Sequence, residues 1–155
     1  MNKKNKSVWG TRIKGKTSNT FQKVSSSIEV DKRLFKEDII ASIAHVEMLN
    51  RQKIINFKIK NKIIWGLRKI QNQIIKKKYV FDYKDEDIHM SIEKKLFELI
   101  GEDAGYIHTA RSRNDQVLVD FKIWMMNSND KLIKILDQTI NNILKIAEKN
   151  IYTIM

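Results

Sequence analysis

Residues 113–155 read RNDQVLVDFKIWMMNSNDKLIKILDQTINNILKIAEKNIYTIM, and this stretch decides the fold class. Its repeating positions step by three or four residues: Val117, Phe121, Trp124, Ser128, Leu132, Ile135, Thr139, Ile143, Ile146 and Asn150. The spacing predicts one helix of roughly 40 residues, a length typical of bundles and coiled coils. Such a helix needs partners. Because it reaches Met155 without a C-cap, Gly or Pro, we expect the chain to be part of a longer, truncated protein.

Three shorter amphipathic helices are predicted upstream, over residues 33–49, 59–75 and 88–99, because their apolar side chains recur at helical spacing. Asp87 and the two acidic residues before it place negative charge at the start of the third helix, where the helix dipole favours it. Gly101 is the expected C-cap of that helix. Residues 101–113 lack periodicity and are predicted to form a loop.

The composition favours helices and a reducing compartment. The chain has 155 residues, 42% of them hydrophobic, with 5 Gly, no Pro and no Cys. Few turn-formers argue against an all-β fold. The absence of Cys excludes disulfides and thiolate zinc sites and favours the cytoplasm. No apolar run reaches the roughly 18 residues that span a membrane, and no signal-peptide core follows the basic N-terminus.

We therefore predict an all-α fold in three parts. Residues 1–20 are expected to form a basic mobile arm, residues 21–112 an N-terminal helical domain, and residues 113–155 the first long helix of a truncated central helical bundle.

The net charge of +12 raises the possibility of nucleic-acid binding. Of the 30 basic residues, 20 lie in residues 1–78, which hold only 5 of the 18 acidic ones. Most are lysines scattered among Asn and Ile, a pattern typical of a solvated surface rather than of a phosphate-tracking face. A basic, helical nucleic-acid-binding protein therefore stays an alternative of lower weight.

The densest group of polar side chains lies where the loop meets the long helix: His108, Thr109, Arg111, Ser112, Arg113, Asn114, Asp115 and Gln116. Ser112 and Asp115 have the spacing of a capping box, and free N–H groups and the positive end of the helix dipole converge there. Such a corner predicts binding of a carboxylate or phosphate. The alternative is a well-capped helix that carries two surface arginines.

The three histidines suggest no metal site, since no pair has metal-ligand spacing. His45 is expected to pack at the core or its boundary. His89 follows a run of acidic residues that favours its protonated form; the alternative is a solvated histidine at a helix N-terminus. Ser27 reads as a turn or N-cap residue, and Asp31 with Arg33 as a local charge pair.

Three segments in this order resemble the argininosuccinate lyase family, within the fumarase and aspartase superfamily that includes the delta-crystallins. They are SSSIEVDKRLFKEDIIASIAHVEML (25–49), DEDIHMSIEKKLFELIG (85–101) and HTARSRNDQVLVDFKIW (108–124), with a weaker match in WGTRI (9–13). The resemblance covers the N-terminal portion of that family. It implies a carbon–nitrogen lyase that splits argininosuccinate reversibly into arginine and fumarate by β-elimination, without metal or organic cofactor, in arginine biosynthesis.

The resemblance also assigns site residues. The matching positions that hold substrate or edge its site are Ser27, Asn114, Ser112, Arg113, His89 and Asp87, with Asp31, Arg33, Thr109 and Arg111 supporting them. The family's proton-transfer His and Ser fall beyond residue 155, so no catalytic residue is assigned and the chain alone is not expected to turn over. The full-length family assembles as a homotetramer with shared active sites.

Three departures from the family pattern bear on activity. Ser25 replaces the usual Asn, Ala41 replaces a Gly, and Ala110 replaces the Gly of the HTGRSRND pattern. If residue 110 needs a positive φ, alanine costs about 1 kcal/mol there. A non-catalytic, crystallin-like structural or interaction protein of the same fold is therefore a second alternative.

Overall fold

The computed structural model of the chain describes residues 20, 24–82 and 84–154. Its helices run over Ile28–Asp31 (α2), Lys32–Leu34 (η1), Phe35–Arg51 (α3), Phe57–Ile75 (α4), Ile88–Ile100 (α5), Gly101–His108 (η2) and Arg113–Lys149 (α6), where η marks a 3-10 helix. Every regular element of these residues is helical, which confirms the all-α prediction. The mobile arm expected over residues 1–20 and the WGTRI match fall almost wholly outside the described residues.

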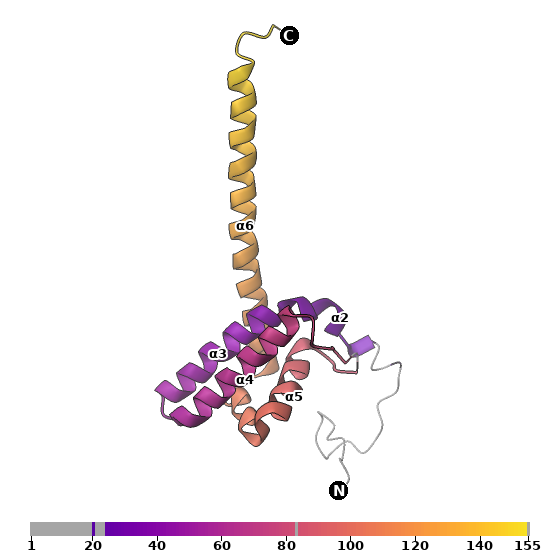
Figure 1. The fold of residues 1–155 in the computed structure, drawn as a ribbon, viewed down its shortest axis with the longest axis vertical. Coiled ribbons are helices and arrows are strands. Elements are labelled where there is room, and N and C mark those ends of the chain that lie inside the picture. The colour runs from indigo at the N-terminus through magenta and orange to yellow at the C-terminus, as the bar shows by residue number, and fades with distance from the viewer. Residues whose placement is uncertain (1–19, 21–23, 83, 155) are drawn as a thin grey trace.

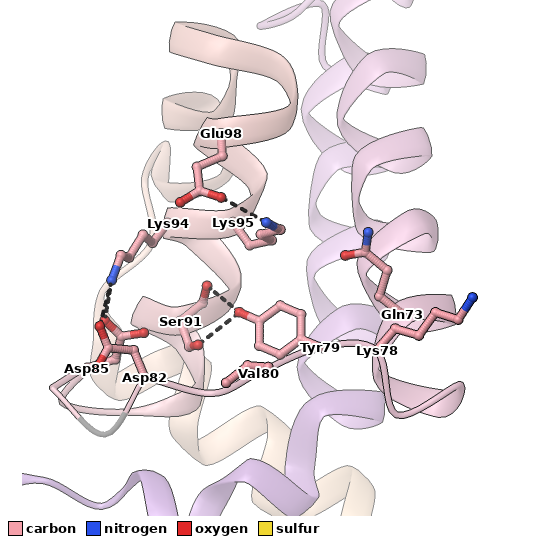
Figure 2. A pocket seen from close by; sticks show the side chains of 10 residues that line it. All are labelled: Gln73, Lys78, Tyr79, Val80, Asp82, Asp85, Ser91, Lys94, Lys95 and Glu98. Atoms are coloured by element: carbon pink, nitrogen blue, oxygen red, sulfur yellow. Dashed lines mark hydrogen bonds and ion pairs between the residues drawn. The ribbon is translucent and has the colours of Figure 1, made fainter.

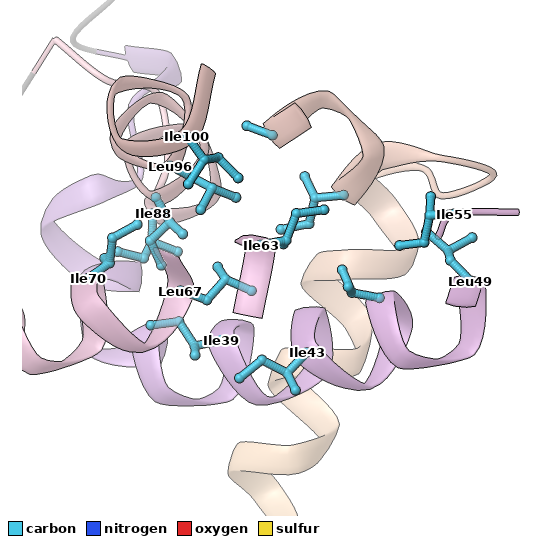
Figure 3. Close-up of a cluster of buried hydrophobic side chains, with 14 of the residues drawn as sticks. Ile39, Ile43, Leu49, Ile55, Ile63, Leu67, Ile70, Ile88, Leu96 and Ile100 are labelled. Atoms are coloured by element: carbon cyan, nitrogen blue, oxygen red, sulfur yellow. The ribbon is translucent and has the colours of Figure 1, made fainter. Parts of the chain in front are cut away.

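A hydrophobic core joins α3, α4 and α5, which pack against one another at the base of α6 (Figure 1). Its side chains are mostly isoleucines that face one another from these helices (Figure 3). The fully enclosed ones include Ile39, Val46 and Leu49 of α3, Ile63, Leu67 and Ile70 of α4, and Ile88, Ile92 and Leu96 of α5. Each such side chain contributes about 1.5–3 kcal/mol by leaving water. The predicted apolar stripes of the three helices are thereby confirmed.

Side-chain caps fix where the helices of the body begin. Asn56 accepts a hydrogen bond from the N–H of Ile59 (2.9 Å) at the start of α4. Asp87 accepts one from the N–H of Met90 (2.6 Å) at the start of α5. Gly101 ends α5 with φ +74°, a left-handed conformation that glycine adopts without strain. The predicted start and stop signals of α5 are therefore confirmed.

The segment predicted as a loop is largely a 3-10 helix. Residues 101–108 form η2, and Ala104 and Ile107 point into the core with exposed fractions of 5% and 3%. Two apolar residues three apart are too short a pattern to distinguish this turn from a loop. After η2, Ala110 takes φ +53° and the chain turns into α6.

The long helix α6 rises from the body as a single rod (Figure 1). It spans 37 residues and ends at Lys149, where the N–H of Asn150 bonds to the carbonyl of Ala147, so the helix does not continue to residue 155 as expected. Its buried residues are Gln116 and Asp120, near the base. The predicted apolar stripe is exposed along the rod. Among the described helices, none combines the length and the apolar character needed to cross a membrane.

Candidate functional site

The N-terminus of α6 carries the predicted capping box. Ser112 Oγ accepts a hydrogen bond from the N–H of Asp115 (3.2 Å), and Asp115 Oδ2 accepts from the N–H of Ser112 (3.0 Å). The Ser112 hydroxyl and N–H lower the pKa of Asp115. Within the described residues, the N–H groups of Arg113 and Asn114 have no acceptor. These two donors at the positive end of a long helix are open to an anion.

Arg113 is held by the protein on several sides. Its Nη1 and Nη2 donate to the two carboxylate oxygens of Glu93 (2.9 and 3.3 Å), and Nη1 also donates to Gln116 Oε1 (2.6 Å). Its Nε lies 3.4 Å from Asp87 Oδ2. Burial alone would lower the pKa of Arg113, but Glu93 and Asp87 outweigh it and raise that pKa. The guanidinium therefore fixes the base of α6 against α5.

Two further contacts tie the same corner to α3. Arg111 Nη1 donates to Ser42 Oγ (3.1 Å), and His45 Nε2 lies 3.0 Å from the carbonyl oxygen of Thr109. Burial lowers the pKa of His45. The predicted packing role of His45 is confirmed, and Arg111 and Thr109 act here as structural links between α3 and the α6 base.

Ser27 lies beside the start of α5. Its N–H bonds to the carbonyl of Glu86 (2.8 Å), and its hydroxyl donates to Asp31 Oδ2 (2.6 Å). Asp31 Oδ1 accepts from the N–H of Ile88 (3.2 Å). Burial raises the pKa of Asp31 and outweighs the hydrogen bond from Ser27. These bonds fasten α2 to the α5 N-terminus, whose Asp87 contacts Arg113.

Arg33 differs from its expectation, whereas Asn114 is accessible as expected. Arg33 donates from Nε to the carbonyl of Val30 (2.9 Å), and no ion pair joins it to Asp31 among the residues that the structure describes, so the expected charge pair is wrong. Asn114 is exposed on the first turn of α6, where its side chain is free to face a ligand.

His89 is buried, which excludes the alternative of a solvated histidine at a helix N-terminus. Only 2% of it is exposed, and its Nδ1 lies 2.9 Å from Asp38 Oδ1 and 3.4 Å from Asp120 Oδ2. Gln116 Nε2 donates to the same oxygen of Asp38 (2.7 Å). Since Gln116 Oε1 accepts from Arg113, one line of hydrogen bonds runs from Arg113 through Gln116 and Asp38 to His89.

The ionisable groups of this cluster shift one another's pKa values. Burial alone would lower the pKa of His89, but the hydrogen bond and charge of Asp38 outweigh it and raise that pKa. Burial alone would raise the pKa of Asp38, but His89 and Gln116 hold it below its usual range. Burial and the negative charge of Asp38 raise the pKa of Asp120 to about 8.

Donor atoms of Asp38, His89 and Asp120 all lie within 4.8 Å of one another, a set that could also hold a cation. Spacing along the sequence, on which the prediction of no metal rested, does not reveal such a cluster. The residues that sequence reasoning missed are Asp38, Glu93 and Asp120. All three are acidic residues on helices; Asp38 and Asp120 are buried and Glu93 is partly buried.

A hollow of about 380 Å³ lies elsewhere, against α5 and the segment that follows α4 (Figure 2). Its lining comprises Gln73, Lys78, Tyr79, Val80, Asp82, Asp85, Ser91, Lys94, Lys95 and Glu98. Lys94 lies 3.1 Å from Asp85, and the Tyr79 hydroxyl donates to the carbonyl of Ser91 (2.9 Å). None of the predicted site residues lines this hollow.

The fold and the α6 corner together define a class: an all-α protein with open N–H donors for an anionic ligand at the base of a long helix. The chain belongs to the family described as lyase, which it matches over residues 11–155.

Among its relatives are argininosuccinate lyases. The chain is 62% identical over 154 residues to argininosuccinate lyase of Pelagibacter ubique strain HTCC1062, an alignment that covers 99% of this chain and 33% of that protein. It is 46% identical over 149 residues to that of Campylobacter jejuni strain RM1221 (96% and 32% covered). It is 49% identical over 148 residues to that of Ehrlichia chaffeensis strain Arkansas (96% and 32% covered). The chain thus spans about a third of the length of the curated relatives that it matches.

Proposed function

We propose that these residues form the substrate-holding wall of an argininosuccinate lyase, which splits argininosuccinate into arginine and fumarate by reversible β-elimination. The observation that carries the proposal is the α6 corner, where free N–H groups, the Ser112 cap and exposed Asn114 meet the His89 cluster of α5. The 62% identity to argininosuccinate lyase of Pelagibacter ubique, over an alignment that covers 99% of this chain, supports it.

At this wall of the site, the elimination needs hydrogen-bond donors that stabilise a dianion more than it needs groups that release a proton. Removing a proton beside a carboxylate leaves an aci-carboxylate dianion, which hydrogen-bond donors held in place stabilise. The N–H groups of Arg113 and Asn114 and the side chain of Asn114 supply such donors, whereas the Ser27 hydroxyl is committed to Asp31. Arg113 itself is committed to Glu93 and Gln116. We therefore assign its guanidinium to holding the wall in place, together with long-range attraction of an anion.

We propose the remaining properties of the complete protein from its resemblance to the argininosuccinate lyase family. The proton-transfer His and Ser of the family lie beyond residue 155, so the 155 residues alone are expected to be inactive. The complete protein would act without cofactor, in the cytoplasm, as a homotetramer whose sites are shared between subunits. Its partners would be argininosuccinate, arginine and fumarate.

A chimaera tests the function. The first third of the Pelagibacter ubique relative is replaced by this chain, and fumarate release from argininosuccinate is followed by ultraviolet absorbance. We expect turnover from the chimaera and none from the 155-residue chain alone. In the chimaera, Asn114→Ala should lower kcat/KM at least tenfold, which corresponds to about 1.4 kcal/mol. Asn141→Ala, an exposed Asn far along the same helix, is the matched control. An inactive but folded tetrameric chimaera would contradict the proposal.

The nucleic-acid alternative has one structural feature to support it. A shallow groove of about 430 Å³ on α4 is lined by Trp65, Arg68, Lys69, Asn72, Gln73, Lys76 and Lys78. Lys69 Nζ lies 4.7 Å from the centre of the Trp65 ring and covers one face of it. Binding of single-stranded DNA with a steep salt dependence would favour this alternative. Turnover by the chimaera without such binding would favour the lyase over both the nucleic-acid and the crystallin-like readings.

A further inference from the structure

Three buried oxygens in the cluster behind the site have no hydrogen-bond partner among the residues that the structure describes: Asp38 Oδ2, Asp120 Oδ1 and Asp120 Oδ2. Asp38 comes from α3 and Asp120 from α6, and both are almost wholly enclosed, with exposed fractions of 1% and 0%. The group of opposite charge that faces both is the imidazole of His89. Two carboxylates this close to each other cannot both ionise without a large cost.

We propose that Asp38 and Asp120 share one proton, carried by Asp120, and that this pair acts as a positioning device that holds His89 as an imidazolium. Because Nδ1 of His89 is committed to Asp38, the N–H that remains for a ligand is Nε2–H. That N–H would donate to a carboxylate of the substrate, a step that rests on the proposed function.

A single proton accounts for the unpaired atoms. An O–H on Asp120 can donate to Asp38 Oδ2, which gives two of the three orphaned oxygens a partner. Asp38 Oδ1 already accepts from Gln116 Nε2 (2.7 Å) and faces His89 Nδ1 (2.9 Å). Asp38 accepts from Gln116 and faces His89 at hydrogen-bond distance, so it is the better anion, while Asp120 accepts no hydrogen bond from the residues that the structure describes and is the better acid. The raised pKa of Asp120 and the lowered pKa of Asp38 agree with this order.

The hydrogen-bond line also fixes the direction of the Gln116 amide. Arg113 Nη1 donates to Gln116 Oε1 (2.6 Å), so the amide nitrogen must face the carboxylate of Asp38. The orientation of His89 is thereby coupled to the same guanidinium that Glu93 holds at the base of α6.

Charges on every neighbouring element act on the cluster. Besides Asp38 of α3 and Asp120 of α6, the negative charge of Asp87 at the α5 N-cap raises the pKa of His89. Asp31 at the end of α2 interacts with His89 as well. The positive charge of Arg111 acts on both Asp38 and Asp120, and that of Arg113 interacts with Asp38.

A bound cation is the competing explanation, and the contacts disfavour it. A metal ligated by His89 Nδ1 would need that nitrogen deprotonated and about 2.0–2.1 Å from the ion. Here Nδ1 faces Asp38 Oδ1 directly, and the NH₂ of Gln116 points at the same oxygen. With Nδ1 protonated, as proposed, that proton and the Gln116 NH₂ would occupy the space that a cation requires.

The test is an NMR titration of the 155-residue chain, with its three histidines and the Asp carboxyl carbons assigned. We expect the Asp120 carboxyl to titrate near 8, the Asp38 carboxyl to stay ionised throughout, and both nitrogens of His89 to be protonated near pH 7. Asp120→Asn should keep His89 protonated, since its amide can still donate to Asp38. Asp38→Asn should lower the proton affinity of Asp120 at least tenfold, about one pKa unit. The double variant should lower that of His89 by a similar factor.

Asp137→Asn, an exposed position on α6, is the matched control and should leave all three groups unchanged. Three results would overturn the proposal: an Asp120 carboxyl that titrates below about 5, an Asp120→Asn change that deprotonates His89, or displacement of the Nδ1 proton by equimolar Zn²⁺. The wild-type carboxyl titration decides alone if a variant fails to fold. Because no readout depends on turnover, an inactive chimaera would contradict the proposed function without touching this result.

Discussion

Both carboxylate oxygens of Glu93 on α5 accept hydrogen bonds from the guanidinium of Arg113 at the base of α6, at 2.9 and 3.3 Å. His108 Nε2 lies 2.7 Å from the same carboxylate, so Glu93 joins α5, η2 and α6. Burial alone would raise the pKa of Glu93, but His108 and Arg113 outweigh it and hold that pKa below its usual range.

The first prediction is that Glu93→Gln loosens the α6 base. The change removes a charge but keeps the size of the side chain, and we expect a loss of about 1–2 kcal/mol in unfolding free energy because Arg113 loses its paired anion. The stabilisation exists above the ordinary Glu pKa and is lost as pH falls through the lowered folded value, so the variant should lose less stability in acid. Urea unfolding measures both. Glu98→Gln on the α5 surface should stay within about 0.5 kcal/mol.

A second prediction concerns Ala110, whose φ of +53° lies in the left-handed region. Ala110→Gly removes a Cβ that is strained there, and we expect a gain of about 0.5–1 kcal/mol after the larger unfolded-state entropy of glycine is subtracted. Thermal unfolding should show a rise of about 2–4 °C per kcal/mol. Ala44→Gly, an exposed position within α3, should instead destabilise by about 1 kcal/mol. Two changes of the same sign would contradict the assignment of strain.

Gly66 gives a third prediction, from close packing between α4 and α5. A Cβ added at Gly66 would lie 2.5 Å from Leu96 Cδ1 and 3.3 Å from Ile100 Cγ2. Gly66→Ala should therefore cost about 1–3 kcal/mol by overpacking, despite the better helix propensity of alanine. At Gly105 no atom of the residues that the structure describes lies within 4 Å of the new Cβ, so Gly105→Ala should change stability little. Urea unfolding measures both variants, and equal changes in their unfolding free energies would contradict the prediction.

The fourth prediction is a fall in stability with rising pH. The pKa of Asp120 is about 8 in the folded chain and 3.8 ordinarily. Between these pH values Asp120 is protonated in the folded state and ionised in the unfolded state. The free energy of unfolding therefore falls by about 1.4 kcal/mol for each unit of rising pH. The raised pKa of His89 acts in the same direction above its ordinary 6.5. From about pH 6 to about pH 8 the wild type should lose about 2–3 kcal/mol more than Asp120→Asn. Urea unfolding at each pH gives the unfolding free energy of both proteins, and equal changes with pH for the wild type and Asp120→Asn would refute this. The control Asp137→Asn should follow the wild type.

The fifth prediction concerns the apolar ridge of α6. Leu132, Ile135, Ile143 and Ile146 are 54–63% exposed along the rod, and a contiguous apolar surface of this kind promotes association. We expect the chain to self-associate in size-exclusion chromatography with light scattering, and Ile135→Lys with Ile143→Lys to shift it towards monomer. Ile75→Lys, an exposed apolar position on α4, should not. A stable wild-type monomer would be inconsistent with an adhesive ridge.

Local patterns were sufficient for the helices of the body. The stripes of α3, α4 and α5 consist of large aliphatic residues at fixed spacing, and both the Asp87 cap and the Gly101 stop act within a few residues of their own positions. η2 escaped prediction because its register depends on where Ala104 and Ile107 meet the core, which no local signal indicates.

The cluster around His89 could not be predicted in this way. Asp38 is 51 residues from His89 and 78 from Gln116, so their contacts exist only after α3, α5 and α6 have packed. One signal was available: Asp38 lies four residues before Ser42 and eight before Val46, on the face of α3 that is buried. A carboxylate on a buried helical face requires a partner, and that requirement marks the residue for inspection.

Because α6 is long and is held near its base, a small rotation at the base displaces its far end by a large distance. At about 1.5 Å per residue its 37 residues extend some 55 Å, whereas its contacts with α3 and η1 and the Arg113–Glu93 pair with α5 lie near its base (Figure 1). A rotation of 10° about the Arg113 end would therefore sweep the Lys149 end through about 10 Å. A small rotation of α6 where Glu93 meets Arg113 would therefore become a displacement of many ångströms at the far end of the helix.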